Sequence, residues 1–314
     1  MTTISRARSA LRRPKMTPLA RREARQGLLF ISPWLLGFVL FTVFPMLATL
    51  FFSVTNIQLN QEEPLRFVGF DNYSRFLDDK QAIGSLRVTL SFAVLWLPVS
   101  IVAPFLIALL LNSVHLVGRG VFRVLLFMPY VVPFVAGALI WNSMLGLNGW
   151  INEFMRMFGF DIDTPWLRDP SLVYPGLALV GVWGIGGAVI INLAGLRGIP
   201  TELYDAAKID GAGGWAQLRH VTVPLMTPVI FYSLILGVVE VMQYFLVPLV
   251  LTNGTGEPGG TTLFYNLYLY KQFFTFQNMS YGATLAWVLF VITLAITLLV
   301  FWSARRWVYY AGER

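Results

Sequence analysis

Glu240 stands out chemically because it is the only acidic or basic residue near the centre of a predicted membrane span. A lone charge at that depth is costly unless it is paired, hydrated or protonated. Gln243 and Tyr244 follow at i+3 and i+4 on the same helix face, and Tyr232 precedes them. Polar acceptors beside aromatic rings suit a sugar. Two interpretations stay open: Glu240 lines a solute pathway, or it pairs with a polar group on a neighbouring subunit.

Trp141, Trp183 and Asn192, which lie within other spans, are weaker candidates for the same pathway. Aromatic residues make up 15% of the chain, so most of them must face lipid or the protein core. We therefore expect the pathway to centre on Glu240 and its neighbours, with Trp183 and Asn192 as secondary contributors.

The chain lacks the residues that thiolate metal sites and a phosphate-binding loop require. Cysteine is absent, which excludes disulfides and thiolate metal sites. The two histidines, His115 and His220, fall in predicted loops, which argues against a buried metal centre. No G-x-x-x-x-G-K-[ST] phosphate loop occurs, so the chain cannot bind ATP by that means. We expect no catalytic residue, metal, cofactor or nucleic-acid partner on this chain. Its energy must come from a partner or from an ion gradient.

Long apolar blocks must position these residues. The chain is 56% hydrophobic and 12% charged, whereas soluble domains carry about 25% charge. Blocks of this length predict membrane spans, and the spans must be helical because lipid offers no hydrogen-bond partners. The fold class is therefore an all-α membrane protein. We expect six spans, at Leu28–Phe52, Leu86–Leu111, Phe122–Leu145, Leu172–Leu196, Val229–Leu251 and Gly282–Ser303.

Positive charge predicts the orientation of these spans. With the N-terminus inside, the cytoplasmic segments hold 16 Lys and Arg and the outer segments hold seven, so both termini are expected inside. The basic tail is either disordered or a short helix from Thr17-Pro18 to Gly27 along the headgroups. The expected divisions are a tail at 1–27, a first span with an outer segment at 28–84, a core at 85–303 and a C-terminal tail at 304–314.

The cytoplasmic segment at 197–228, between the fourth and fifth spans, has the pattern of a folded element. Thr201 can cap a helix with acidic residues in its first turns, which suits the helix dipole. Gly211 then permits a sharp turn. A second short helix follows, with one apolar face at Trp215, Leu218 and Val221, and is closed by Pro224 and Pro228.

This segment resembles the "EAA" coupling loop of ABC-importer permease subunits, whose pattern is E-A-A-x3-G-x9-I-x-L-P. The chain supplies Asp205-Ala206-Ala207, then Gly211, then Val221-Thr222-Val223-Pro224 at the family's spacing. The flanking words Pro200-Thr201-Glu202-Leu203-Tyr204 and Asp210-Gly211-Ala212 are similar to the carbohydrate-uptake branch, which includes maltose, trehalose and glycerol-phosphate systems.

The resemblance implies a type I ABC-importer permease with a cytoplasmic coupling helix. Such a subunit is non-catalytic and sits in the cytoplasmic membrane of a bacterium or archaeon. Its partners would be a second permease subunit, two ATPase subunits carrying ATP and Mg, an extracytoplasmic solute-binding protein and membrane lipid. The residues implied in coupling to the ATPase are Glu202, Asp205, Ala206, Ala207, Asp210, Gly211, Trp215, Leu218 and Pro224. The alternative for this segment is an ordinary interfacial helix.

A looser match follows the fifth span, where the chain is similar to the branch's outer "LTGGGP" loop. The implied contact with the binding protein involves Thr252, Asn253, Gly254, Glu257 and Pro258. The expected solute is a di- or oligosaccharide or a related polyol phosphate. Two other functions stay open from the residues alone: an ion-coupled secondary transporter, which usually shows repeats and several intramembrane charges, and a membrane-embedded transferase.

Overall fold

The computed structural model describes residues 17–113, 116–160 and 164–310. Most of the expected basic tail and the end of the expected C-terminal tail lie outside these residues. Within them the secondary structure is helical, apart from one isolated β-bridge between Thr55 and Phe67. The chain divides into two compact units, at 1–51 and 52–314.

The N-terminal unit is a continuous helical run made of α1 (Pro18–Phe38), the π-helix η1 (Val39–Val43) and most of α2 (Phe44–Ser53). Thr17 caps it by accepting a hydrogen bond from the Ala20 N–H at 3.2 Å, with Pro18 in the first turn. This confirms the predicted helix start. The helix does not end at Gly27, however, and runs on into the first span. No residue of α1 is buried, as expected for a helix that meets lipid or a protein partner on its sides.

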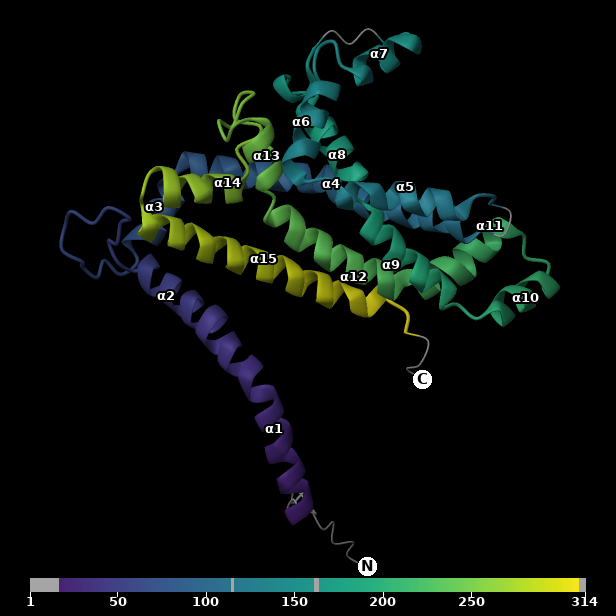
Figure 1. Cartoon of the computed structure of the whole chain (residues 1–314), viewed down its shortest axis with the longest axis horizontal. Helices are drawn as coiled ribbons and strands as arrows, with labels where there is room; N and C mark the ends of the chain where they lie inside the picture. Colours follow the sequence, from purple (N-terminus) through teal and green to yellow (C-terminus); the bar gives the residue numbers. More distant parts are fainter. Residues whose placement is uncertain (1–16, 114–115, 161–163, 311–314) are drawn as a thin grey trace, which may run out of the picture. The chain divides into compact units, whose positions relative to one another are not determined.

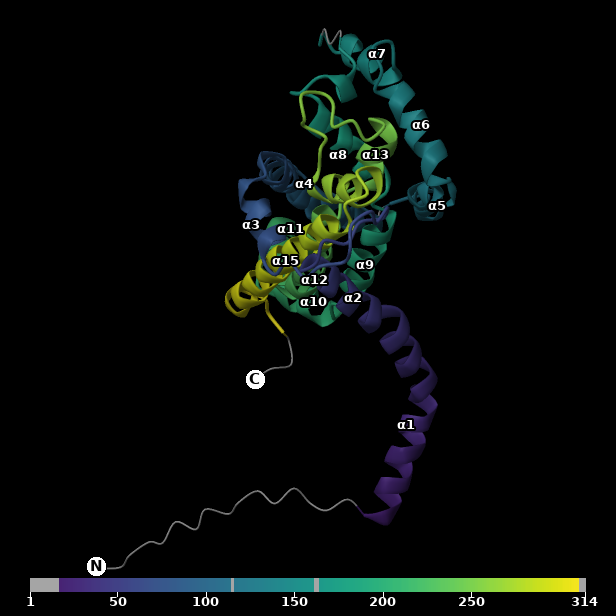
Figure 2. The ribbon, with the colours of Figure 1, turned by 90° about the vertical axis from the view of Figure 1, so that its left-hand side faces the viewer.

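The second unit packs its helices around α4, which contacts α8, α9, α12 and α14 (Figures 1 and 2). Its largest fully buried side chains are aromatic and include Phe92 on α4, Phe264, and Tyr281 on the last helix. In chain order the elements are α3 (Asp71–Asp78), α4 (Lys80–Asn112), α5 (Arg119–Val131), α6 (Phe134–Met144), α7 (Trp150–Met157), η2 (Trp166–Arg168), α8 (Val173–Trp183), α9 (Gly186–Arg197), α10 (Thr201–Ile209), α11 (Gly214–Gln217), η3 (Leu218–Thr222), α12 (Val223–Met242), α13 (Leu246–Leu251), α14 (Tyr265–Tyr270), η4 (Lys271–Thr275) and α15 (Met279–Trp307).

Length and composition identify the candidate spans among the described residues. Four helical runs qualify on their own, and the pair α8 and α9, bent by 59°, qualifies together as a fifth. The four runs are Pro18–Ser53, Lys80–Asn112, Gly214–Leu251 and Met279–Trp307.

The expected span Phe122–Leu145 is not among these candidates, because the chain there is divided between α5 and α6. The break lies at Val132 and Pro133, both with extended ψ angles of 124° and 133°. Proline has no N–H to donate, and it disfavours helical geometry at the residue before it.

The run Gly214–Leu251 begins before the expected span Val229–Leu251. The prediction that Pro224 and Pro228 close the cytoplasmic segment is wrong, since both lie inside α12. Pro224 occupies the first turn, where a missing N–H is tolerated. Pro228 cannot donate to the Pro224 carbonyl, but the Thr227 hydroxyl donates to that oxygen at 2.6 Å. A side chain thus supplies the hydrogen bond that proline removes.

Candidate functional site

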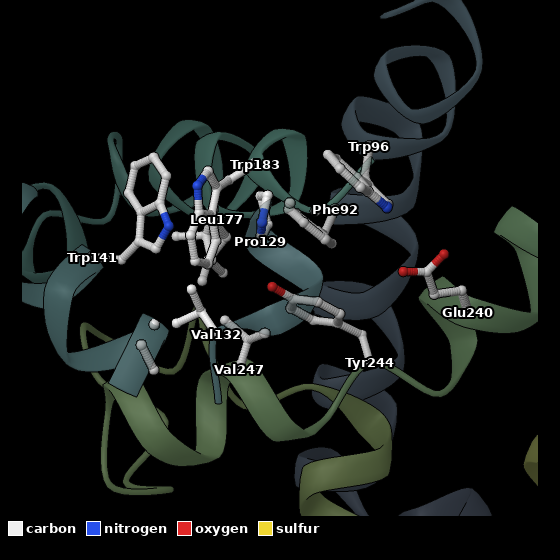
Figure 3. Close-up of a pocket in the computed structure, with 15 residues that line it drawn as sticks. Phe92, Trp96, Pro129, Val132, Trp141, Leu177, Trp183, Glu240, Tyr244 and Val247 are labelled. Carbon is white, nitrogen blue, oxygen red and sulfur yellow. The ribbon is translucent and has the colours of Figure 1, made fainter. Parts of the chain in front are cut away.

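A pocket of about 320 Å³ lies among α4, α5, α6, α8, α12 and α13 (Figure 3). Trp141 and Trp183 lie together at one end of it, with ring centroids 6.2 Å apart in an edge-to-face arrangement. Glu240 and Tyr244 lie on the other side. An apolar, aromatic wall with a few polar groups is the usual composition of a small-molecule site. Here the polar groups are a carboxylate and a phenol.

Glu240 lies near the end of α12 and lines a second pocket as well, of about 300 Å³. Both pockets share Glu240, Trp96 and the Gly181–Gly184 region of α8. The Glu240 carboxylate points toward the first pocket in Figure 3, and no described residue donates a hydrogen bond to it. The two hollows therefore lie next to each other, and both are lined by a carboxylate that no described residue pairs with.

Tyr244 faces the pocket because the helix breaks directly before it. Helix α12 ends at Met242, and α13 begins at Leu246. Pro248 leaves the Tyr244 carbonyl, four residues earlier, without its helical donor, which accounts for the break. The Tyr244 ring packs on Phe92, with centroids 5.1 Å apart, and its hydroxyl points into the pocket.

The same break corrects the predicted helix face of Glu240, Gln243 and Tyr244. Gln243 is the C-terminal cap of α12 and is not among the residues that line either pocket. Its main-chain oxygen accepts a hydrogen bond from the Asn266 side chain at 3.0 Å. The i, i+3, i+4 relation required a helix that continues through Tyr244, and the helix does not.

Of the secondary candidates, Trp183 lines the first pocket and Tyr232 lines the second. Asn192 lines neither pocket. It is buried within α9, where its side-chain amide donates to the Ala188 carbonyl at 2.8 Å. A polar residue in a span can satisfy its own helix in this way, so its presence alone did not indicate a site.

Trp141, a weaker candidate from the sequence, also lines the first pocket, and sequence reasoning missed Phe92 and Trp96, which line it too. The Trp96 ring packs directly against a glycine, because a Cβ on Gly181 would lie 2.3 Å from that ring. Similarly, a Cβ on Gly137 would lie 3.0 Å from the Trp183 ring. Paired large and small residues shape this pocket, and such pairs are not visible without the helix contacts.

The coupling loop, defined here as residues 197–228, contains α10, a bend at Gly211, α11 and the start of the long α12 run. Gly211 has φ of +80°, a region that favours glycine. The cap of α10 is Pro200, without a side-chain hydrogen bond, so the expectation of capping by Thr201 is wrong. The bend is closed by main-chain hydrogen bonds from Gly211 to Lys208 at 3.0 Å and from Ala212 to Ala207 at 2.8 Å.

Two side-chain contacts tie this bend together, and sequence reasoning missed both. The Tyr204 hydroxyl on α10 lies 2.9 Å from the Thr222 hydroxyl in η3. The Gln217 amide on α11 donates to the Ala212 carbonyl at 2.8 Å. They connect the two sides of the loop across the bend, so α10 is held at a defined angle to the long helix.

The outward surface of the coupling loop is rich in exposed apolar side chains. Ile209 is 87% exposed and Trp215 is 74% exposed. Glu202, Ala206 and Asp210 are also exposed, whereas Ala207 and Leu218 are half-buried. Asp205 pairs with Lys208 at 3.0 Å on the surface, a contact of little energetic value. Large apolar groups exposed beside ordered polar ones are typical of a protein-binding surface.

The loop after α13 lines a third, more polar pocket of about 450 Å³. Thr252, Asn253, Glu257 and Pro258 line it, together with Arg168 and other residues of the α6–α8 region. Gly254 is buried beneath them, and its carbonyl accepts a hydrogen bond from the Lys271 ammonium at 3.1 Å. Four of the five residues expected in this loop thus share one hollow.

A set of hydrogen bonds that sequence reasoning missed joins α4, α14, η4 and α15. We call it the Asp79 cluster; it comprises Asp79, Tyr268, Gln272, Tyr281 and Arg75. Asp79 accepts from the Tyr268 and Tyr281 hydroxyls at 2.7 and 2.6 Å, and from the Gln81 and Ala82 N–H groups at the start of α4. The Gln272 amide donates to the Tyr268 oxygen at 2.7 Å, and Arg75 stacks over the Tyr281 ring.

These bonds set the charge state of Asp79. Partial burial by itself would raise the pKa of Asp79, but the tyrosine and backbone hydrogen bonds outweigh it and hold the pKa below its ordinary value. Burial, followed by the hydrogen bond to this carboxylate, raises the pKa of Tyr268. At neutral pH the cluster is therefore an ionised carboxylate held by protonated tyrosines.

Comparison with known proteins places the chain among transport proteins. The family model described as "Binding-protein-dependent transport system inner membrane component" matches residues 82–308. The chain is 34% identical to the probable ABC transporter permease protein YesP of Bacillus subtilis, over 93% of this chain and 94% of that protein. It is 32% identical to the lactose transport system permease protein LacF of Rhizobium radiobacter, over 89% and 94% of the two chains.

A third relative, the trehalose/maltose transport system permease protein MalF of Thermococcus litoralis, is 31% identical over 89% of this chain and 94% of that protein. Among solved structures, a chain of a bacterial ABC transporter involved in the import of the acidic polysaccharide alginate superposes with a TM-score of 0.73. The two share 22% identity, over 92% of this chain and 99% of the other. This likeness shows a shared fold.

Proposed function

Because the chain belongs to the family of binding-protein-dependent transport system inner membrane components, and is a non-catalytic permease subunit of an ABC importer, we propose that its solute is a sugar that passes Glu240. Relatives named for lactose and for trehalose and maltose support this substrate class. Membership of this family decides against the two other functions that the residues alone left open, a secondary transporter and a transferase.

The observation that carries the proposal is the pair of adjacent pockets that share Glu240. A sugar needs hydrogen-bond acceptors for its hydroxyls and flat apolar surfaces for its C–H faces. The first pocket offers Trp141, Trp183 and Tyr244 as surfaces and Glu240 as acceptor. The second pocket continues past Glu240 toward Tyr232. We place Glu240 at the step between them, where it contacts the solute in transit rather than a helix of the second permease.

For topology we propose six spans with both termini in the cytoplasm. The helices α5 and α6, each too short to cross the membrane alone, would together form one span with its break at Pro133. The pair α8 and α9 is interrupted as well, and α5, α6 and α8 all contribute residues to the first pocket. Interrupted helices at membrane depth are tolerated where they line a cavity.

We propose that the coupling loop docks on an ATPase subunit and transmits its movement to α12. The support is the exposed apolar pair Ile209 and Trp215, with the Tyr204 contact that fixes α10 against the helix carrying Glu240. Two ATPase subunits would bind ATP and Mg, and a second permease would complete the pathway. An extracytoplasmic solute-binding protein would contact the loop after α13, four of whose expected residues line a polar pocket.

Transport by the complete importer in proteoliposomes tests the proposal. We expect uptake of a disaccharide or oligosaccharide, and about tenfold slower uptake in Trp183→Ala, because ring stacking and burial together are worth about 1.4 kcal/mol. Trp302→Ala is the matched control, since Trp302 lies on α15, is 59% exposed and lines neither pocket. Equal uptake by both variants, or no uptake of any sugar supplied with its binding protein, would contradict the proposal.

A further inference from the structure

A separate hollow of about 320 Å³ lies between α5 and α9, and it carries two arginines with no acidic residue in its lining. Arg123 projects from the first half of α5, and Arg197 is the last residue of α9. The remaining lining residues are Leu111, Leu126, Phe127, Gly186, Val189, Ile190, Leu193 and Ala194. The hollow shares none of its residues with the two pockets at Glu240, so it is a separate feature.

The backbones of α5 and α9 come very close together at Gly186, beside the hollow. A Cβ on Gly186 would lie 2.2 Å from the Leu126 carbonyl oxygen, which shows how closely the two backbones approach there. Gly186 is the first residue of α9, and Leu126 lies past the middle of α5. Figure 1 draws them spreading apart toward the end of the molecule where α10 and α11 lie. Both arginines belong to that open end.

The guanidinium of Arg123 lacks a partner that its burial requires. Its Nε is buried and makes no hydrogen bond in the described structure. No described residue forms an ion pair or side-chain hydrogen bond with Arg197 either. A buried, unpartnered charged donor is costly, and two positive charges that face one hollow without a carboxylate repel each other. An anion in the hollow would remove both penalties.

The surroundings indicate which anion. The walls beyond the arginines are apolar, and the adjacent face of α5 exposes Val121, Val124 and Leu125 by more than half. A free inorganic ion would gain nothing from these surfaces. A molecule with a phosphate and hydrocarbon chains would place its phosphate between the guanidiniums and its chains along α5.

We infer that the hollow between α5 and α9 binds the phosphate of an anionic phospholipid, through Arg123 and Arg197, at the cytoplasmic edge of the membrane. A single lipid there would hold α5 against α9 beside the point where α9 leads into the coupling loop. The cytoplasmic placement rests on the proposed topology, but the lipid site itself does not.

Native mass spectrometry of the detergent-purified full chain tests the inference, with dioleoyl phosphatidylglycerol and dioleoyl phosphatidylcholine as probes. We expect phosphatidylglycerol to be retained in preference to phosphatidylcholine. Each of Arg123→Gln and Arg197→Gln should weaken its retention about tenfold, the value of one lost charge-assisted hydrogen bond. Arg305→Gln, an exposed arginine outside the hollow, should leave retention unchanged.

Arg123→Lys separates a binding role from a structural one, because it keeps the charge and should retain more phosphatidylglycerol than Arg123→Gln at the same thermal stability. Equal retention of the two lipids by the natural chain would overturn the inference, as would unchanged retention in both glutamine variants. Displacement of the lipid by millimolar inorganic phosphate would assign the site to a free anion instead. Transport of sugar is not part of this readout, so failure here leaves the proposed function standing.

Discussion

The coupling loop and the Asp79 cluster both depend on a tyrosine hydroxyl that joins distant segments, yet they are built in opposite ways. In the coupling loop the Tyr204 contact fixes a bend whose outer side chains, Ile209 and Trp215, remain exposed. In the Asp79 cluster both tyrosines, Tyr268 and Tyr281, are buried and converge on one carboxylate. The first arrangement leaves large apolar side chains exposed, as the proposed docking on a partner requires, and the second buries its aromatic side chains inside the protein.

This difference predicts that substitutions in the two regions will separate stability from assembly. A buried acceptor shared by several donors affects the free energy of unfolding, because its removal leaves each donor unsatisfied. An exposed apolar side chain adds little to folding but can dominate binding.

The largest effect is expected for Asp79→Ala. It removes the cap of α4 and the acceptor of two tyrosine hydroxyls, which should lower the free energy of unfolding by about 2–4 kcal/mol. Thermal unfolding of the purified chain in detergent measures this. Asp78→Ala is the matched control, because Asp78 is exposed at the end of α3. If both variants unfold at the natural temperature, the cluster has no structural role.

Trp215→Ala should act on assembly and leave folding intact. Loss of an exposed tryptophan at the centre of an interface typically costs about 2 kcal/mol of binding, so affinity for the ATPase should fall about thirtyfold. Binding of the ATPase to the nanodisc-embedded permease measures it. Trp150→Ala is the control, since Trp150 on α7 is 75% exposed, against 74% for Trp215. Equal affinities in the two variants would remove Trp215 from the docking surface.

Tyr204→Phe should have a smaller effect, on both the stability of the chain and its assembly with the ATPase. It deletes one hydroxyl and with it the contact to Thr222, which is worth about 1 kcal/mol. The ATP hydrolysed per sugar transported should rise, since α10 is held less firmly. A double-mutant cycle with Thr222→Val isolates the contact. Additive effects of the two substitutions would show that the hydroxyls are not coupled.

The smallest expected effect is a pH dependence at the Asp79 cluster. Because the folded-state pKa of Asp79 is below its ordinary value, its stabilising contribution is present at neutral pH. It is lost as the pH falls below about 4 and through the lowered folded pKa. The difference in unfolding temperature between the natural chain and Asp79→Asn should therefore shrink toward pH 3. Because the carboxylate is partly exposed, solvent screening keeps this difference small.

The same comparison shows how far the sequence could predict the structure. The coupling loop was predictable because its residues are contiguous and Gly211, with φ of +80°, marks the bend directly. The Asp79 cluster was not, because its tyrosines are separated from Asp79 by about 190 to 200 positions, and nothing local indicates that they meet.

The residues of the proposed solute pathway could be predicted from the sequence only in part. Glu240 was predictable as a lone charge in a span, and the structure places it where two pockets meet. Gln243 was misplaced, because a helix break that Pro248 causes is not specified by spacing alone. Phe92 and Trp96 were missed, because their positions depend on contacts between helices, such as the approach of Trp96 to Gly181.

The most direct test of the central claim, that the coupling loop links ATP hydrolysis to the pathway, is the ratio of sugar uptake to ATP hydrolysis in the reconstituted importer carrying Gly211→Asp. A Cβ at Gly211 would meet no atom within 4 Å, and Asp and Asn both tolerate positive φ. Gly211→Asn therefore controls for backbone strain, and the pair isolates a negative charge at the docking surface. We predict that Gly211→Asp loses uptake about tenfold or more relative to Gly211→Asn, while binding of the sugar-loaded binding protein is unchanged. Equal uptake by Gly211→Asp and the natural chain would contradict the account.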